Sequence, residues 1–311
     1  MSSPSPDRPS IVVVGSANTD MVITAPRIPS PGETILGTSF VMAPGGKGAN
    51  QAVAAARLGA AVTFVARVGT DLFGSEAIAG YQRDGIDTAF IVRDPDAPSG
   101  IAMIVVDAHG ENAIVVASGA NMRLTPADVD RAEHAIAEAD LLILQLEVPD
   151  ETVRHAVELA TAHRIPVILN PAPAHPLDDA LLQQVEYLTP NETEARILTG
   201  IDVVDDASAD RAARTLLGRG VRTVVLTLGA RGAWLATDGG GRLIPTARVQ
   251  AVDTTAAGDA FNGGLAVALA VRHTLDEAVR FANHVGALAV TKLGAQPSMP
   301  TRDEVDAFMG D

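Results

Sequence analysis

The sequence predicts an α/β fold in which helices flank a doubly wound, mainly parallel central sheet that carries a small β-sheet lid. Short apolar runs typical of strands buried on both faces recur along the chain, at residues 11–14, 62–65, 141–144, 167–169 and 224–226. Helical stretches separate the longer runs, for example at residues 126–138 and 151–163. This alternation is typical of βαβ units, whose right-handed crossovers build a sheet covered by helices.

Two segments interrupt the alternation. Residues 18–46 are rich in Pro and Gly, and residues 100–117 contain two apolar runs on either side of residues 107–110, which predicts a β-hairpin. We expect strands from about residues 18–45 and 100–117 to form a small sheet outside the main one. Such a sheet suits a lid over a site, and its apolar face suits a homodimer contact. Ordinary edge hairpins are the alternative.

Composition limits the partners and the location. The 311 residues include 23 basic and 38 acidic ones, a net charge of −15 that repels nucleic acids and anionic membranes. ATP is still allowed, because a local positive end outweighs the global field at short range. The chain has no cysteine, and its polar start, residues 1–10, lacks the apolar core of a signal peptide. Because no repeat or membrane-length apolar run occurs, we expect a cytoplasmic protein with residues 1–311 in one domain.

The most informative stretch is residues 252–264, where a turn of small residues opens a helix. Free backbone amides and the positive end of the helix dipole make such a turn an anion site, and small side chains let a phosphate approach. Asp259, in the first helical turn, is a carboxylate that can take the proton of an attacking hydroxyl. The alternative is that Asp259 only caps the helix.

A second glycine-rich turn, residues 43–48, precedes an Ala-rich helix. It is not a Walker A loop, because the spacing before Lys47 and a Ser or Thr after it are both missing. Close backbone approach, with Lys47 and Asn50 as donors, suits a polyhydroxylated ligand, and Lys47 can also steady phosphate charge. A solvated lysine in a plain turn is the alternative.

Polar residues also follow the predicted strands. Asn18 and Asp20 lie on one face of an extended chain and can hold adjacent sugar hydroxyls, unless they are turn residues. Glu147, residues 191–194 and residues 227–232 follow later strands, where ligand sites form in such sheets. Their alternatives are a solvent-facing Glu147, a helix-stabilising Glu194 and a plain turn at 227–232.

These segments together resemble the PfkB-type carbohydrate kinase family, along nearly the whole chain and in the same order. The matching segments are residues 18–20, 45–50, 170–173, 189–194, 227–229 and 253–259. Within the family the chain is most similar to members that act on ribose. The resemblance implies transfer of the γ-phosphoryl group of ATP to the 5-hydroxyl of D-ribose, which gives ribose 5-phosphate and ADP.

The resemblance also implies roles for residues. Asp259 would be the general base, and the amides of Ala256, Ala257, Gly258 and Asp259 would form an anion hole. The implied sugar pocket contains Asn18, Asp20, Gly46, Lys47, Asn50, Glu147 and Asp259. The implied nucleotide site contains Asn191, Thr227, Gly229, Gly232, Gly258 and Asn283, with Glu194 in the Mg²⁺ region. A monovalent cation, usually K⁺, would lie at Asp253, Thr255, Ala289, Lys292, Gly294 and Ser298, and the lid would form a homodimer.

Three other functions remain open. A relative in the same family could act on deoxyribose, a ketohexose or a nucleoside, because fold does not dictate substrate. A catalytically inactive sugar-binding or regulatory protein could share the scaffold, although the intact Asp259 argues against it. A dinucleotide-dependent oxidoreductase is disfavoured, because no second or third glycine of the dinucleotide fingerprint follows Gly15.

Overall fold

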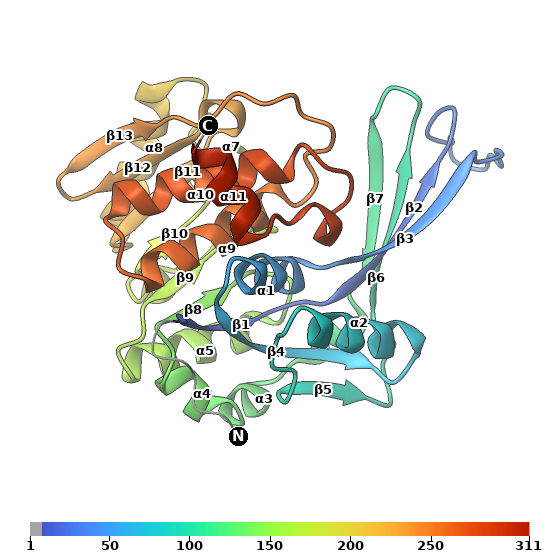
Figure 1. Ribbon diagram of the computed structural model, residues 1–311, viewed down its shortest axis with the longest axis horizontal. Helices are drawn as coiled ribbons and strands as arrows, with labels where there is room; N and C mark the ends of the chain where they lie inside the picture. Colours follow the sequence, from blue (N-terminus) through green and yellow to red (C-terminus); the bar gives the residue numbers. More distant parts are fainter. Residues whose placement is uncertain (1–7, 311) are drawn as a thin grey trace.

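The computed structural model describes residues 8–310, so most of the polar segment at residues 1–10 lies outside the described residues. A nine-stranded sheet forms its centre (Figure 1). Its spatial order is β13 (Gly240–Ile244), β12 (Ala233–Thr237), β11 (Thr223–Thr227), β10 (Tyr187–Leu188), β9 (Val167–Leu169), β8 (Leu141–Leu144), β1 (Ser10–Val14), β4 (Ala61–Gly69) and β5 (Ile91–Asp94). Neighbouring strands from β11 to β5 pair in parallel, whereas β12 pairs antiparallel with both β11 and β13. The predicted, mainly parallel sheet is confirmed.

Helices cover both faces of this sheet (Figure 1). One face carries α1 (Lys47–Arg57), α2 (Leu72–Arg83), α9 (Ala257–Ala270), α10 (Leu275–Ala289) and α11 (Arg302–Gly310). The other carries α3 (Pro126–Asp130), α4 (Glu133–Ala137), α5 (Asp150–Ala162), α6 (Asp179–Leu182), α7 (Glu192–Thr199) and α8 (Asp206–Gly218). Strand β1 supplies both cores, because Ile11 and Val13 pack on the first face and Val12 and Val14 on the second. Among the described residues, no helix is long and apolar enough to cross a membrane.

Two local predictions need correction. The single helix expected at residues 126–138 is instead two short helices, α3 and α4, because the chain leaves helical geometry at Ala132. Val129, Ala132 and Ile136 are nevertheless all buried, so the break preserves the apolar face that the sequence pattern predicted. The strand expected directly before residues 191–194 is only the two-residue β10, which ends at Leu188. The helix predicted at residues 151–163 is confirmed as α5.

A separate four-stranded sheet projects beside the main body, at the right of Figure 1. We call it the small sheet, and its order is β3 (Ser39–Gly45), β2 (Asn18–Thr24), β6 (Gly100–Val106) and β7 (Asn112–Ala117). Strands β6 and β7 form the predicted hairpin, and the Asp107 carboxylate closes its turn by accepting from the backbone amides of His109 (2.7 Å) and Glu111 (3.0 Å). Because β2 pairs with both β3 and β6, the alternative of two ordinary edge hairpins is wrong.

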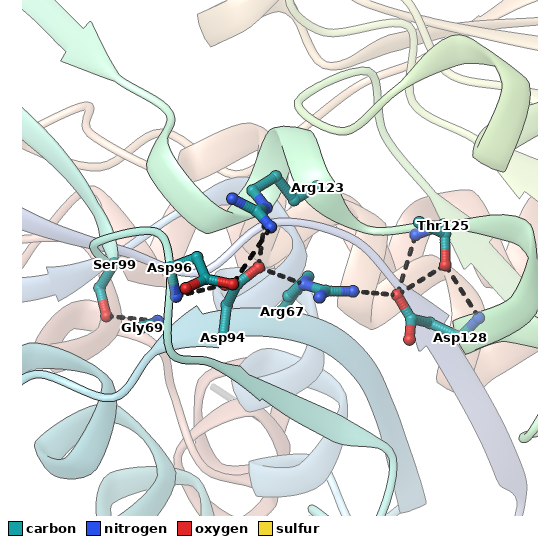
Figure 2. Close-up of polar contacts among 8 residues, drawn as sticks. All are labelled: Arg67, Gly69, Asp94, Asp96, Ser99, Arg123, Thr125 and Asp128. Atoms are coloured by element: carbon teal, nitrogen blue, oxygen red, sulfur yellow. Dashed lines mark hydrogen bonds and ion pairs between the residues drawn. The ribbon is translucent and has the colours of Figure 1, made fainter.

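A cluster of ion pairs joins strands β4 and β5 of the main sheet to the segment that follows the small sheet (Figure 2). The fully buried carboxylate of Asp94, at the end of β5, accepts from Arg67 of β4 (2.8 Å) and from Arg123 (2.9 Å). Arg123 ends the short 3₁₀ helix η1 (Gly119–Arg123) that follows β7. Arg67 also bonds Asp128 of α3 (2.8 Å), whose carboxylate accepts from the Thr125 amide. The cluster thereby ties together β4, β5, η1 and α3.

Candidate active site

The order of the strands changes direction between β1 and β8, and the candidate site begins at the carboxyl ends of these two strands. The hydroxyl of Ser16, just after β1, donates to Glu147 Oε2 (2.5 Å), three residues after β8. The same oxygen accepts from the backbone amide of Lys47 at the start of α1 (3.0 Å). Glu147 therefore joins three elements, and the alternative of a merely solvent-facing side chain is wrong.

Asn18 and Asp20 begin the small sheet and lie on one face of β2. Gly45 lies opposite Asn18, and a Cβ at Gly45 would come within 2.3 Å of the Asp20 carboxylate. Gly46 has a φ of 90°, and a Cβ there would lie 2.7 Å from the Asn18 amide. Only glycines allow this approach, so the 43–48 turn brings the backbone next to both predicted sugar-binding residues.

Asp259 lies in the first turn of α9, where it is 6 % exposed. Its Oδ2 accepts from Asn50 Nδ2 (2.9 Å) and its Oδ1 from Gln51 Nε2 (2.9 Å), both on α1. Helix α9 starts after Ala256, whose φ is 58°, and it has no side-chain cap. The capping alternative for Asp259 is therefore wrong, because the carboxylate bonds side chains of another helix.

The turn before α9 presents free donors. Within residues 8–310, the backbone amides of Gly258 and Asp259 have no hydrogen-bond acceptor. Ala256 holds the turn in a left-handed conformation that is costly for a non-glycine residue, and such strain concentrates at functional sites. These amides and the positive end of the α9 dipole can bind an anion.

A cavity of about 170 Å³ adjoins this turn. It brings together residues from five separate segments of the chain, namely Lys47, Asn170, Ala172, Thr189, Asn191, Glu194, Thr227, Thr254, Ala256, Ala257, Gly258, Asp259 and Asn262. Eight of the predicted site residues are in this set. A phosphoryl group in the cavity would therefore meet both the free amides and the carboxylate of Asp259.

Carboxylates dominate the electrostatics of the site. Burial raises the pKa of Asp20 to about 6, and the nearby charges of Glu147 and Asp259 add to this effect, whereas Lys47 opposes it. Burial also raises the pKa of Asp259, against the opposing influence of Lys47 and the two amide donors. Burial alone would lower the pKa of Lys47, but the carboxylates of Asp259, Glu147, Glu194 and Asp20 raise it above its usual value. Lys47 is therefore held charged.

Asn191 and Glu194 form a capping box at the start of α7, in which each side chain accepts from the other residue's amide (2.8 Å in both cases). The helix-stabilising role considered for Glu194 is confirmed. Burial raises the pKa of Glu194 above its usual value, and its carboxylate also lines the 170 Å³ cavity. A capped carboxylate beside an anion site is compatible with Mg²⁺, which prefers oxygen ligands and brings water and phosphate oxygens with it.

Three residues of the implied nucleotide site do not line that cavity. Asn283 is buried, and its Nδ2 donates to the carbonyl of Ile244 (2.8 Å), which fixes the chain after β13. Gly232 has a φ of 105°, and a Cβ there would lie 2.2 Å from the same Ile244 oxygen. Gly229 has a φ of 54° and open space around it.

The segments implied in cation binding lie side by side. Asp253 Oδ1 accepts from the Thr255 amide (2.9 Å), and Asp253 Oδ2 accepts from the Gly294 amide (2.8 Å). The amide of Lys292 donates to Ala289 O (3.2 Å), and the Ser298 hydroxyl donates to Ala295 O in the same loop. Carboxylate, hydroxyl and carbonyl oxygens suit a hard cation. Across the described chain, no three His, Cys, Asp or Glu side chains gather as a metal site.

A larger cavity, about 560 Å³, opens between the small sheet, α2 and the 3₁₀ helix η3 (Gln296–Ser298). Asn18 is the only predicted site residue that lines it, and Asp259 is not among its lining residues. We assign the chemistry to the smaller cavity, because it alone combines a buried carboxylate with free backbone amides.

The chain has close similarity to known proteins. Residues 8–302 match the pfkB family carbohydrate kinase model. The chain is 47% identical to the ribokinase of Haemophilus influenzae over 302 residues (97% of this chain, 99% of the relative). It is 39% identical to the deoxyribokinase of Salmonella typhi over 301 residues (96% and 98%). The structure of Arabidopsis thaliana ribokinase complexed with ribose and ATP matches with a TM-score of 0.90 and 32% identity, covering 98% of this chain and 99% of the other. This chain therefore belongs to the pfkB family of carbohydrate kinases.

Proposed function

We propose that this protein transfers the γ-phosphoryl group of ATP to the 5-hydroxyl of D-ribose and releases ribose 5-phosphate and ADP. The observation that carries the proposal is the buried carboxylate of Asp259 beside the unbonded amides of Gly258 and Asp259, in one cavity with Lys47. The relatives that act on ribose, at up to 47% identity, support the choice of sugar.

In this mechanism Asp259 takes the proton of the 5-hydroxyl while the hydroxyl oxygen attacks the γ-phosphorus. The bond between that phosphorus and the bridging oxygen breaks, and ADP leaves with the electron pair. The unbonded amides of Gly258 and Asp259 and the charged Lys47 stabilise the negative charge on the transferring group. The amide of Ala257, also implied in the anion hole, instead donates to Thr254 O (3.3 Å). A positioned general base of this kind contributes roughly 10²–10⁴-fold to the rate.

The proposed sugar pocket uses Asn18, Asp20, Gly46, Lys47, Asn50 and Glu147. The set combines carboxylate acceptors with amide and ammonium donors, which suits a ligand whose hydroxyls both donate and accept. Such a site discriminates strongly against a substrate that lacks one hydroxyl, because a buried polar group is then left without a partner.

Asn191, Thr227, Gly229, Gly232 and Asn283 belong to the proposed nucleotide site. Thr227 ends β11, and its amide bonds Pro190 O (2.9 Å), so the start of α7 and the 227–232 turn lie next to each other. Glu194 would hold Mg²⁺ together with the phosphates of ATP. The ion neutralises phosphate charge when bound.

A monovalent cation, K⁺, completes the proposal. Asp253, Thr255, Ala289, Lys292, Gly294 and Ser298 would hold it, mainly through backbone carbonyls. When bound, it adds positive charge close to the anion turn, because the 253–255 segment leads directly into that turn.

We also propose a homodimer formed through the small sheet. Met21, Met42, Met103 and Val115 lie directly opposite one another across the four strands, on the face away from Asp20. Met42, Met103 and Val115 are 51%, 42% and 71% exposed, an apolar row that a second copy would cover. A cytoplasmic location, where ATP is available, is part of the same proposal.

A substrate panel at fixed ATP tests the function. We expect D-ribose to give the highest kcat/KM, ahead of 2-deoxyribose, fructose and adenosine. 2-Deoxyribose is the second candidate, because the 39% identical relative is a deoxyribokinase. Faster phosphorylation of 2-deoxyribose, fructose or adenosine than of ribose would replace the proposed substrate.

A further inference from the structure

Two glutamine side chains without a role in the proposed mechanism lie fully buried behind Asp259. Gln51 is on α1, one residue after Asn50, and Gln145 directly follows β8. Gln51 Nε2 donates to Asp259 Oδ1 (2.9 Å) and to Asn170 Oδ1 (3.1 Å). Gln51 Oε1 accepts from Gln145 Nε2 (2.7 Å). Every hydrogen-bonding atom of the Gln51 side chain is therefore used.

The orientation of the Gln51 amide matters, because its two ends have opposite polarity. With its nitrogen towards Asp259, the amide stabilises a carboxylate, whereas a flipped amide would place oxygen against oxygen. The bonds around Gln51 decide which end of its side-chain amide is the nitrogen. Asn170 Nδ2 donates to the backbone carbonyl of Thr189 (3.1 Å), which has no alternative orientation. Asn170 therefore presents its oxygen to Gln51, and Gln51 must present its nitrogen.

Gln145 donates to the oxygen of the Gln51 amide from the other side, and Gly15 provides the space for the Gln145 side chain. A Cβ at Gly15 would lie 2.2 Å from Gln145 Oε1. Gly15, directly after β1, thus leaves room for the Gln145 side chain to reach Gln51. It has this role in place of one in a dinucleotide-binding loop. The chain of bonds runs from a backbone carbonyl to the carboxylate that the proposed reaction uses.

We propose that Gln51, oriented by Gln145 and Asn170, is a positioning residue that holds the carboxylate of Asp259 ionised and aimed at the acceptor hydroxyl. The inference rests on the proposed function of Asp259. A buried amide that donates to a carboxylate favours its charged form and restricts its rotation. Asn50 provides the second such bond from the same helix, but it also faces the proposed sugar pocket.

The charged groups around Asp259 show why the Gln51 hydrogen bond matters for the protonation of this carboxylate. Burial raises the pKa of Asp259, the Lys47 ammonium and the Asn50 and Gln51 bonds lower it, and Glu147 raises it. Asp20 and Glu194 face the same region with like charge. Loss of the Gln51 donor leaves Lys47 and Asn50 alone to oppose burial, so the carboxylate would take up a proton at higher pH.

The first test compares the pH dependence of kcat/KM for ribose in Gln51→Met, Gln145→Met and wild-type protein. We expect the acid limb of Gln51→Met to move to higher pH by about one unit, since a hydrogen bond to a charged group has that order of strength. At pH values below this limb, kcat/KM of Gln51→Met should be about tenfold lower than that of wild type. It should recover towards pH 9. Gln145→Met should shift the limb in the same direction by less, because its side chain does not touch Asp259.

Thr152→Val is the matched control. Thr152 is also fully buried on α5, and its hydroxyl donates to Leu124 O (2.7 Å), on the face of the main sheet opposite to α1 and α9. This variant should lose stability without any shift of the acid limb. A loss in Gln51→Met that is uniform across pH, or an unmoved limb in both glutamine variants, would overturn the inference. If Gln51→Met does not fold, Gln145→Met decides the question alone.

A second measurement separates this inference from the proposed function. Carboxyl ¹³C NMR of ligand-free protein, with Asp259→Asn to assign the resonance, follows the titration of Asp259 without any turnover. A higher titration midpoint in Gln145→Met than in wild type supports the inference even if ribose is not the substrate. An unchanged midpoint overturns it, even if ribose is phosphorylated.

Discussion

The side-chain amide of Asn50 donates a hydrogen bond to the carboxylate of Asp259 (2.9 Å), and so joins α1 to α9 close to the start of both helices. The two glycine-rich turns that the sequence analysis singled out therefore converge on one point, although they are about 200 positions apart. A residue of the proposed sugar pocket thereby helps to hold the proposed base in place, which is the preorganisation that phosphoryl transfer needs.

Asp259→Asn tests the base. The substitution keeps the shape of the side chain but cannot accept the hydroxyl proton, so kcat for ribose should fall by about 100-fold or more. Initial rates by a coupled ADP assay measure the effect, and the circular dichroism melt reports the fold. A variant that retains activity within about tenfold of the parent would exclude Asp259 as general base.

Asp20→Asn should raise stability and weaken sugar binding. The pKa of Asp20 is about 6 in the folded protein, above its ordinary value of 3.8. Between these two pH values the folded state keeps a proton that the unfolded chain has released, so the free energy of unfolding falls as pH rises and stays lower above pH 6.

An asparagine at this position cannot ionise. We therefore expect the variant to melt at a higher temperature than wild type at pH 7.5, with a free energy of unfolding that is larger by at most roughly 3 kcal/mol. The gain should shrink at pH 5. The KM for ribose should rise at least about tenfold, because a charged acceptor is lost. Equal melting temperatures of the variant and wild type at pH 7.5 would show that ionised Asp20 does not destabilise the folded protein.

Potassium should activate the enzyme. Rates measured in KCl should exceed those in tetramethylammonium chloride of equal ionic strength by several-fold, and Asp253→Ala should lose most of this difference. The variant removes both the carboxylate and its bond to the Gly294 amide, which holds the two cation segments together. Equal wild-type rates in the two salts would contradict the proposed cation site.

Val115→Asp should convert the proposed dimer to a monomer. Val115 is 71% exposed in the apolar row of the small sheet, and a buried, unpaired carboxylate at an interface is strongly unfavourable. Sedimentation velocity measures the change. Val204→Asp, at a valine before α8 that is 77% exposed, is the control and should remain dimeric. A wild-type monomer at micromolar concentration would contradict the proposal.

Much of the fold could be predicted because its signals are local. Strands buried on both faces leave continuous apolar runs, and the hairpin at 100–117 has its turn residues between two such runs. The end of the helix at Ala132 left no comparable signal, because the apolar spacing continues across the break.

The site was predictable only in part. Glycine turns before helices and polar residues after strands indicated Lys47, Asn50, Glu147 and Asp259. Gln51 also follows a glycine turn, and Gln145 also follows a strand. Their role depends on hydrogen-bond partners about 100 to 200 residues away, which the sequence does not reveal. Asn121 was missed for the same reason: its amide donates to Asn18 Oδ1 (2.7 Å) from a helix after the small sheet.

The most direct measurement is a crystal structure with ribose and a non-hydrolysable ATP analogue bound together. We expect the 5-hydroxyl oxygen within hydrogen-bond distance of the Asp259 carboxylate, about 2.6–3.2 Å, and the γ-phosphate against the amides of Gly258 and Asp259. A terminal phosphate bound away from that turn, or ribose held in the 560 Å³ cavity beside α2, would contradict it.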